Sequence, residues 1–172
     1  MLLKKSVCLL LALLLIPFFG SCKKQKNIVP APDFNAFEMT ADIQYGDMKL
    51  EAALTRRAMN LYRLSFTAPV ELKGFTVDYD GEELSIAYMG LSFKTYPAAL
   101  PDQSVFTGLF SVFNRISLGD SLNIKDTAQG QTLSGQSDSG AFTVTLNDDG
   151  LPKEISMPDI DLTAVIREFK AL

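Results

Sequence analysis

Apolar and polar side chains alternate along much of this chain, and this period of two constrains its fold more than any other feature. The alternation is clearest over residues 37–45, 48–55 and 62–67. It continues through residues 75–88, where Asp80-Gly81 has the composition of a tight hairpin turn. Each stretch is therefore predicted to be a strand of an antiparallel sheet, with one buried face and one exposed face.

The period changes between residues 97 and 119. Pro97 and Pro101 interrupt the strand pattern, and apolar residues then recur at helical spacing from Val105 to Ile116, with Gly119 placed to end the helix. Short strands are expected on both sides of this helix, near residues 91–96, 122–125, 132–135, 141–147, 153–158 and 162–169. We therefore predict a mainly β (α+β) fold with nine or ten antiparallel strands and one main helix.

The areas of the sheet and the helix predict how the two pack. Ten strands of six residues present an apolar face of roughly 48 by 20 Å. A helix of 14 residues is about 21 Å long and 10 Å across, so it covers roughly a fifth of that face. We expect a curled antiparallel sheet that forms an incomplete barrel around the helix. Two packed sheets would also bury the apolar face, but they would leave the helix less surface to cover.

The N-terminus has the composition of an export signal. Lys4 and Lys5 precede an apolar run over residues 7–19, which is too short to span a bilayer, and Gly20-Ser21 stands directly before Cys22. A small pair before cysteine is typical of a lipoprotein signal, in which that cysteine receives a diacylglyceryl group. The alternative is an ordinary cleaved signal followed by an unrelated cysteine. We predict a lipoprotein signal peptide over residues 1–21, the lipidated Cys22 with a flexible tether over 22–33, and a β-rich half-barrel domain over 34–172.

Charge and composition restrict the chemistry that the mature chain can perform. Without Lys4 and Lys5 its net charge is −6, which argues against a nucleic-acid partner. The sequence has no histidine, and neither of its two cysteines would remain as a free thiol, so the common hydrolytic triads and zinc sites lack their residues. We therefore expect no enzymatic activity, no catalytic residue, no metal and no cofactor.

Carboxylates gather at two turns, over residues 78–83 and at Asp148-Asp149. A calcium site or a glycosidase-like pair would need such side chains. The first cluster lacks the loop length and the following glutamate of a calcium loop, so solvated turns are the favoured interpretation.

Aromatic residues provide the second candidate site. Phe106, Phe110 and Phe113 crowd one helix, where they could fill an ordinary core or line a cavity for acyl chains. The sequence leaves both alternatives open.

The order of motifs resembles the lipoprotein-carrier superfamily, the LolA/LolB-like half-barrels. The resemblance covers about residues 37–169 and rests on five motifs: Ile43-Gln44-Tyr45, Tyr62 to Phe66 followed by Pro69, Val77 to Gly81 leading to Leu84 and Tyr88, the helix, and Asp149 to Pro152. It implies an unclosed antiparallel barrel whose concave apolar face, covered by helices, binds acyl chains. Two departures are the absence of a helix before the first strand and the presence of a tether, which is more like the membrane-bound receptor than the soluble carrier.

The function expected from these features is that of a membrane-anchored envelope lipoprotein that binds a hydrophobic ligand, such as a lipid or a lipoprotein acyl chain. The alternative is a non-enzymatic structural or protein-interaction module with a filled core. The expected ligand-binding walls are Tyr62, Leu64, Phe66, Phe75, Phe93, Phe106 and Phe110. The expected location is extracytoplasmic, on the outer face of the cytoplasmic membrane or on the periplasmic or outer-membrane face. The protein would be held there by the diacylglyceryl anchor at Cys22, where an envelope protein is a possible partner.

Overall fold

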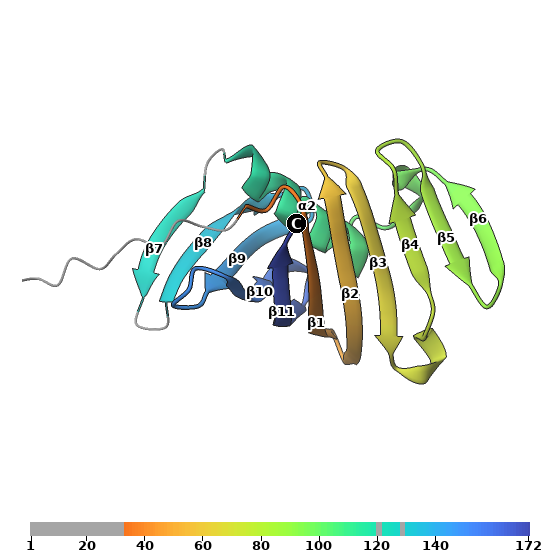
Figure 1. The fold of residues 1–172 in the computed structure, drawn as a ribbon, viewed down its shortest axis with the longest axis horizontal. Helices are drawn as coiled ribbons and strands as arrows, with labels where there is room; N and C mark the ends of the chain where they lie inside the picture. Colours follow the sequence, from red (N-terminus) through yellow and green to blue (C-terminus); the bar gives the residue numbers. More distant parts are fainter. Residues whose placement is uncertain (1–32, 120–121, 128–129) are drawn as a thin grey trace, which may run out of the picture.

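A computed structural model describes residues 33–119, 122–127 and 130–172 of the chain. The predicted signal peptide, Cys22 and nearly all of the predicted tether lie outside these ranges. The described residues form one sheet of eleven antiparallel strands (Figure 1). The strands are β1 Phe37–Tyr45, β2 Met48–Ala58, β3 Leu61–Ala68, β4 Thr76–Tyr79, β5 Leu84–Tyr88, β6 Leu91–Thr95, β7 Asn123–Thr127, β8 Gly130–Ser137, β9 Gly140–Leu146, β10 Pro152–Met157 and β11 Leu162–Ala171.

Two meanders make up the sheet and meet at its centre. The strand order is β6-β5-β4-β3-β2-β1-β11-β10-β9-β8-β7, so the first and last strands are neighbours (Figure 1). Phe37 on β1 lies opposite Ala171 on β11, and Tyr45 lies opposite Leu162. Because β6 and β7 are the two edges of the sheet, the chain between them must cross its face. The helix α2, Val105–Leu118, lies in this crossing.

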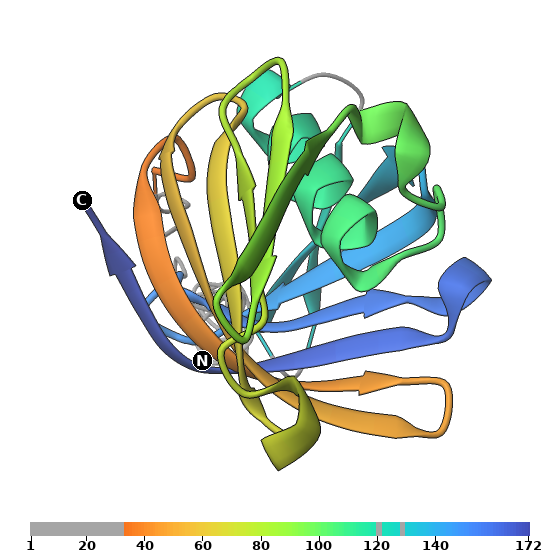
Figure 2. The same cartoon turned by 90° about the vertical axis from the view of Figure 1, so that its right-hand side faces the viewer.

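The prediction of an incomplete barrel of nine or ten strands around a helix is wrong. The structure is a single curled sheet of eleven strands that does not close, with one short helix lying on its concave side (Figure 2). The alternating pattern identifies the buried face of a strand but does not encode where a sheet ends or how far it curls. All five residues of β7 are exposed, as are the first four of β6. The two edge strands therefore remain exposed, and the sheet does not wrap around the helix to bury them.

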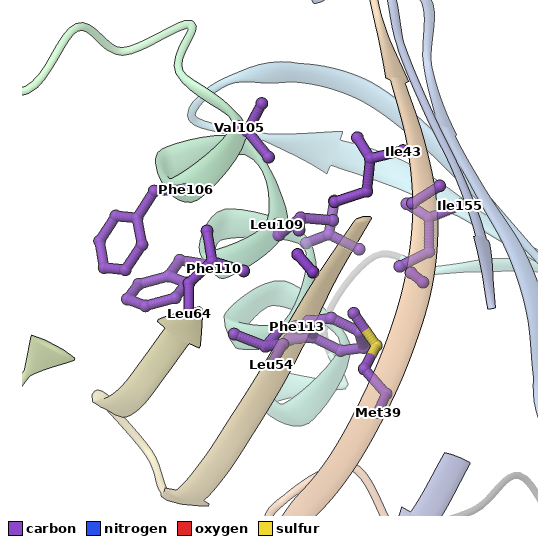
Figure 3. Packing of buried hydrophobic residues seen from close by; sticks show 14 of the residues in the cluster. Met39, Ile43, Leu54, Leu64, Val105, Phe106, Leu109, Phe110, Phe113 and Ile155 are labelled. Carbon is purple, nitrogen blue, oxygen red and sulfur yellow. The ribbon is translucent and has the colours of Figure 1, made fainter. Parts of the chain in front are cut away.

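The predicted alternation is confirmed in the central strands. On β1 the side chains of Phe37, Met39 and Ile43 are buried, whereas Glu38 and Asp42 are exposed. The inward side chains of β1 and its neighbours form one hydrophobic core together with the apolar face of the helix (Figure 3).

Local sequence signals account for the ends of the helix. Ser104 caps its first turn in a capping box, accepting a hydrogen bond from the backbone N–H of Thr107, whose hydroxyl accepts one from the backbone N–H of Ser104. At the other end Gly119 adopts a φ of 69°, the left-handed conformation that favours glycine. The prediction of a helix that begins at Val105 and ends at Gly119 is therefore confirmed. Within the described residues no helix is long and apolar enough to cross a membrane.

Candidate functional site

A cavity of about 400 Å³ lies beside the helix, on the side of strands β4 and β5. It is separate from the filled interface between helix and sheet, where Leu109, Val112 and Phe113 are fully buried. The apolar walls of the cavity come from Tyr79, Leu84, Pro97, Leu100, Phe106 and Phe110. Its volume falls within the range of about 300 to 1,000 Å³ that is usual for small-molecule pockets.

One flank of the helix provides much of this lining. Phe106, Phe110 and Asn114 are spaced four residues apart, so their side chains lie above one another on the same face. Thr107 and Ser111 form the adjacent row. The row is held against the second meander because the Ser111 hydroxyl lies 3.0 Å from that of Ser137 on β8. The proline-bearing segment that leads into the helix, which contains the short 3-10 helix Pro97–Ala99, closes another side of the cavity.

Three of the seven predicted wall residues form one aromatic cluster. The rings of Tyr62 and Phe110 stack with their centroids 3.8 Å apart, and the centroids of the Phe106 and Phe110 rings lie 3.5 Å apart. Figure 3 shows Phe106 projecting from the helix away from the core residues Met39 and Ile155. The structure therefore brings Tyr62, Phe106 and Phe110 together at the boundary between the core and the cavity.

The other four predicted wall residues lie elsewhere. Leu64 is fully buried in the core. Phe66 and Phe75 pack against each other, with Tyr88 beyond them, and none of the three lines the cavity. Phe93 lies on the edge strand β6 with 59% of its surface exposed. The predicted seven residues thus divide among a cavity wall, the core, a second aromatic group and the sheet edge.

The polar end of the cavity is organised by Asn114. Its Oδ1 accepts a hydrogen bond of 2.6 Å from the Tyr62 hydroxyl, and its Nδ2 donates one of 3.1 Å to Asn60 Oδ1. Asn60 has a φ of 63° in the turn between β2 and β3, a conformation that asparagine tolerates better than most residues. Both amides line the cavity and fix the position of the tyrosine.

Arg56 lies behind Asn114 and is fully buried. Its Nη1 donates to the carbonyl oxygens of Phe34 and Phe113, at 2.7 and 3.1 Å, and also to the Ser117 hydroxyl. The weaker bonds run from Nε to Ala58 O and from Nη2 to Asn114 Oδ1, and the guanidinium lies 5.2 Å from the centre of the Tyr62 ring. Among the described residues no carboxylate forms an ion pair with it. The side chain thus ties the residues before β1 to the second half of the helix.

Burial shifts the ionisation of both groups in this network. It lowers the pKa of the Arg56 guanidinium, while the nearby Tyr62 and Asp33 act in the opposite direction. It also raises the pKa of the Tyr62 phenol well above its ordinary value of about 10, and the Arg56 charge opposes this only in part. The phenol therefore remains a hydrogen-bond donor to Asn114 throughout the neutral and moderately alkaline range.

Four residues of the site were not identified from the sequence: Arg56, Asn60, Asn114 and Ser139. Signals in the sequence point to two of them, Arg56 and Asn114. In the strand pattern Leu50, Ala52, Leu54 and Arg56 fall on the same, buried face. Asn114 follows Phe110 by four residues and so belongs to the same flank of the helix. Ser139 lies in the turn between β8 and β9, and no sequence pattern connects that turn to the helix.

The acidic clusters take part in turns and ion pairs. The Asp80 carboxylate accepts the backbone N–H groups of Glu82 and Glu83, which lowers the pKa of Asp80. Asp78 pairs with Arg63 at 2.5 Å, and Glu83 pairs with Lys94 at 2.9 Å. In the described part of the chain no group of three or more acidic, histidine or cysteine side chains could hold a metal ion.

Comparison with known proteins identifies relatives by structure only. No protein-family model and no curated protein matches the sequence. An uncharacterized conserved protein from Thermus thermophilus matches with a TM-score of 0.51 and 14% identity, over 80% of this chain and 79% of that chain. A LolA superfamily protein from Nitrosomonas europaea matches with a TM-score of 0.47 and 8% identity, over 83% of this chain and 88% of that chain. A chain of the complex between the CwlD amidase and the GerS lipoprotein from Clostridioides difficile matches with a TM-score of 0.43 and 13% identity, over 81% of this chain and 85% of that chain.

These likenesses concern the fold. The Thermus protein shares the fold of this chain, and at 14% identity the similarity says nothing of function. The two lower TM-scores carry no argument about this chain. The curled, open sheet with a helix on its concave side is nevertheless consistent with the LolA-like half-barrel that the order of the sequence motifs resembles.

Proposed function

We propose that this chain is a membrane-anchored envelope lipoprotein that binds a hydrophobic ligand, a lipid or a lipoprotein acyl chain, in the cavity beside α2. The observation that supports the proposal is the cavity itself, about 400 Å³ in volume, with Phe106, Phe110 and Tyr79 among its walls. The alternative, a core filled entirely by side chains, accounts for the interface between the helix and the sheet but not for this cavity. The role is one of binding rather than catalysis.

The edge strand β6 favours a second candidate function, that of a protein-interaction module. Leu91 and Phe93 are 77% and 59% exposed, and both point to the concave side of the sheet. Exposed apolar residues on an edge strand are a common basis for pairing with another chain. The two functions are compatible, because β6 and the cavity use different residues.

The proposed function requires that Cys22 attaches the protein to the membrane. Replacing Cys22 by alanine should move the protein from the detergent phase to the aqueous phase in a partitioning assay, because the acyl chains supply most of the membrane affinity. Wild-type protein and a Cys8→Ala variant, in which only the expected signal peptide is altered, are the controls. Unchanged partitioning of Cys22→Ala would contradict the anchor but not the cavity.

Ligand binding can be tested by blocking the cavity without touching the core. Ala98 and Ala99 are both exposed, but only Ala98 lines the cavity. We expect full-length wild-type protein from a bacterial envelope to carry co-purified lipid in native mass spectrometry. Ala98→Trp should carry much less, because an indole of this size occupies the space of the acyl chain, and Ala99→Trp should carry as much as wild type.

Two results would overturn the proposed binding function. One is wild-type protein that carries no lipid and binds no acyl ligand added in solution. The other is an equal lipid content in the Ala98→Trp and Ala99→Trp variants. Circular dichroism of each variant checks that the indole has not disturbed the fold.

A further inference from the structure

The charges around the cavity bear on which head group its ligand carries, an inference that rests on the proposed function. Two aspartates, Asp102 and Asp138, line the cavity, and no lysine or arginine is among its lining residues. Both aspartates are exposed at the rim of the cavity, so a carboxylate placed there would meet only charges of its own sign. The electrostatics therefore disfavour a free fatty acid.

The nearest buried cation does not change this conclusion. Arg56 does not line the cavity, and its N–H groups are directed at protein acceptors, chiefly the carbonyl oxygens of Phe34 and Phe113. Asn114 stands between the guanidinium and the cavity and accepts hydrogen bonds from both Arg56 and Tyr62. The Asn114 side-chain oxygen is thus already hydrogen-bonded to protein groups.

The uncharged polar groups of the lining are suited to hydroxyl or ester groups. Ser139 lines the cavity and is only 8% exposed, and its hydroxyl can both donate and accept a hydrogen bond. The Asn60 amide also lines this region and retains donors beyond the bond that its oxygen accepts from Asn114.

We propose that the cavity selects an acyl ligand with an uncharged, hydroxyl-bearing head group, such as an acylglycerol, over a free fatty acid. Asp102 and Asp138 repel the carboxylate, and Ser139 and Asn60 bind the neutral head. The aromatic wall formed by Phe106 and Phe110 takes the acyl chain in both cases, so selectivity arises at the head alone.

The test compares two ligands that differ only in the head group. Dodecanoyl glycerol and dodecanoate, each below its micelle concentration, are titrated into delipidated full-length protein at neutral pH by calorimetry. We expect dodecanoyl glycerol to bind at least about tenfold more tightly. In the double variant Asp102→Asn, Asp138→Asn the affinity for dodecanoate should rise several-fold while that for dodecanoyl glycerol stays the same. Ser139→Ala should weaken the binding of dodecanoyl glycerol only.

A matched control separates local repulsion from overall charge. The double variant Asp148→Asn, Asp149→Asn changes the net charge by the same amount at a turn that is not part of the cavity, and should leave both affinities unchanged. Equal affinities for the two ligands, or tighter binding of dodecanoate, would overturn the head-group selectivity while leaving the proposed binding function intact. If neither ligand binds, the proposed function fails and the selectivity fails with it.

Discussion

Replacing Arg56 by alanine is expected to lower the free energy of unfolding by about 3 kcal/mol or more. The buried carbonyl group of Phe34 and the part-buried one of Ala58 would lose their side-chain donor, and an unsatisfied buried group costs about 1 to 3 kcal/mol. The packing of the arginine stem is lost as well. Because domains of this size are stable by only about 5 to 15 kcal/mol, this is a large fraction of the total. Urea denaturation followed by circular dichroism measures the change.

Two further variants identify the cause of that loss. Arg56→Lys keeps the charge and most of the stem but not the planar fork of donors, so we expect an intermediate loss of stability. Arg57→Ala removes the same kind of side chain from the neighbouring, exposed position and should change the free energy of unfolding by less than about 0.5 kcal/mol. If Arg56→Ala and Arg57→Ala have the same stability, the structural role assigned to Arg56 is wrong.

Replacing Phe113 by alanine should also be strongly destabilising, by about 3 to 5 kcal/mol. Its ring is fully buried and packs against Phe37 and Phe34, with centroids 4.5 and 5.9 Å apart. The new void would be enclosed by core residues that cannot collapse completely. No change in ligand affinity is expected, because Phe113 does not line the cavity.

Phe110→Ala is the matched variant one turn away on the same helix. Phe110 lines the cavity, so its removal enlarges a hollow that already exists, and we expect a smaller loss of about 2 kcal/mol. Binding of dodecanoyl glycerol should fall, since the chain loses part of its aromatic wall. Urea melts and ligand titrations on the two variants give the comparison. Equal effects of both substitutions on stability and on binding would contradict the separation of core from cavity.

Much of the fold was predictable because the buried strands and the helix carry strong periodic signals. Phe37, Met39 and Ile43 on β1 show the period of two that a half-buried strand imposes. Ser104 and Gly119 mark the ends of the helix through capping chemistry that is local in sequence. The edge strand β7 was expected near residues 122–125, but all of its residues are exposed and Ile124 is isolated, so no alternation marks a buried face there. The segments that form strands were found, but how far the sheet curls and whether it closes could not be obtained from periodicity.

The candidate site was predictable only where it continues the core. Phe106 and Phe110 belong to the apolar stripe of the helix, so the aromatic wall followed from the helical pattern, and Tyr62, which stacks on Phe110 from behind the wall, belongs to the apolar face of a strand. The polar lining comes from turns and from the flank of the helix, where position depends on tertiary packing. Ser139 reaches the cavity only because the second meander returns beneath the helix.

The pairing of β1 with β11 at the centre of the sheet has a consequence for how the chain folds. β1 is among the first parts of the domain to be synthesised and β11 is the last, so their ladder cannot form until the whole chain is available. Bringing together segments so far apart in sequence costs loop-closure entropy and slows folding. Until then β1 and β11 are open strand edges in addition to β6 and β7, which remain edges in the finished sheet, and each is open to pairing with other chains. The polypeptide is therefore more open to pairing with other chains before β11 docks on β1 than after it.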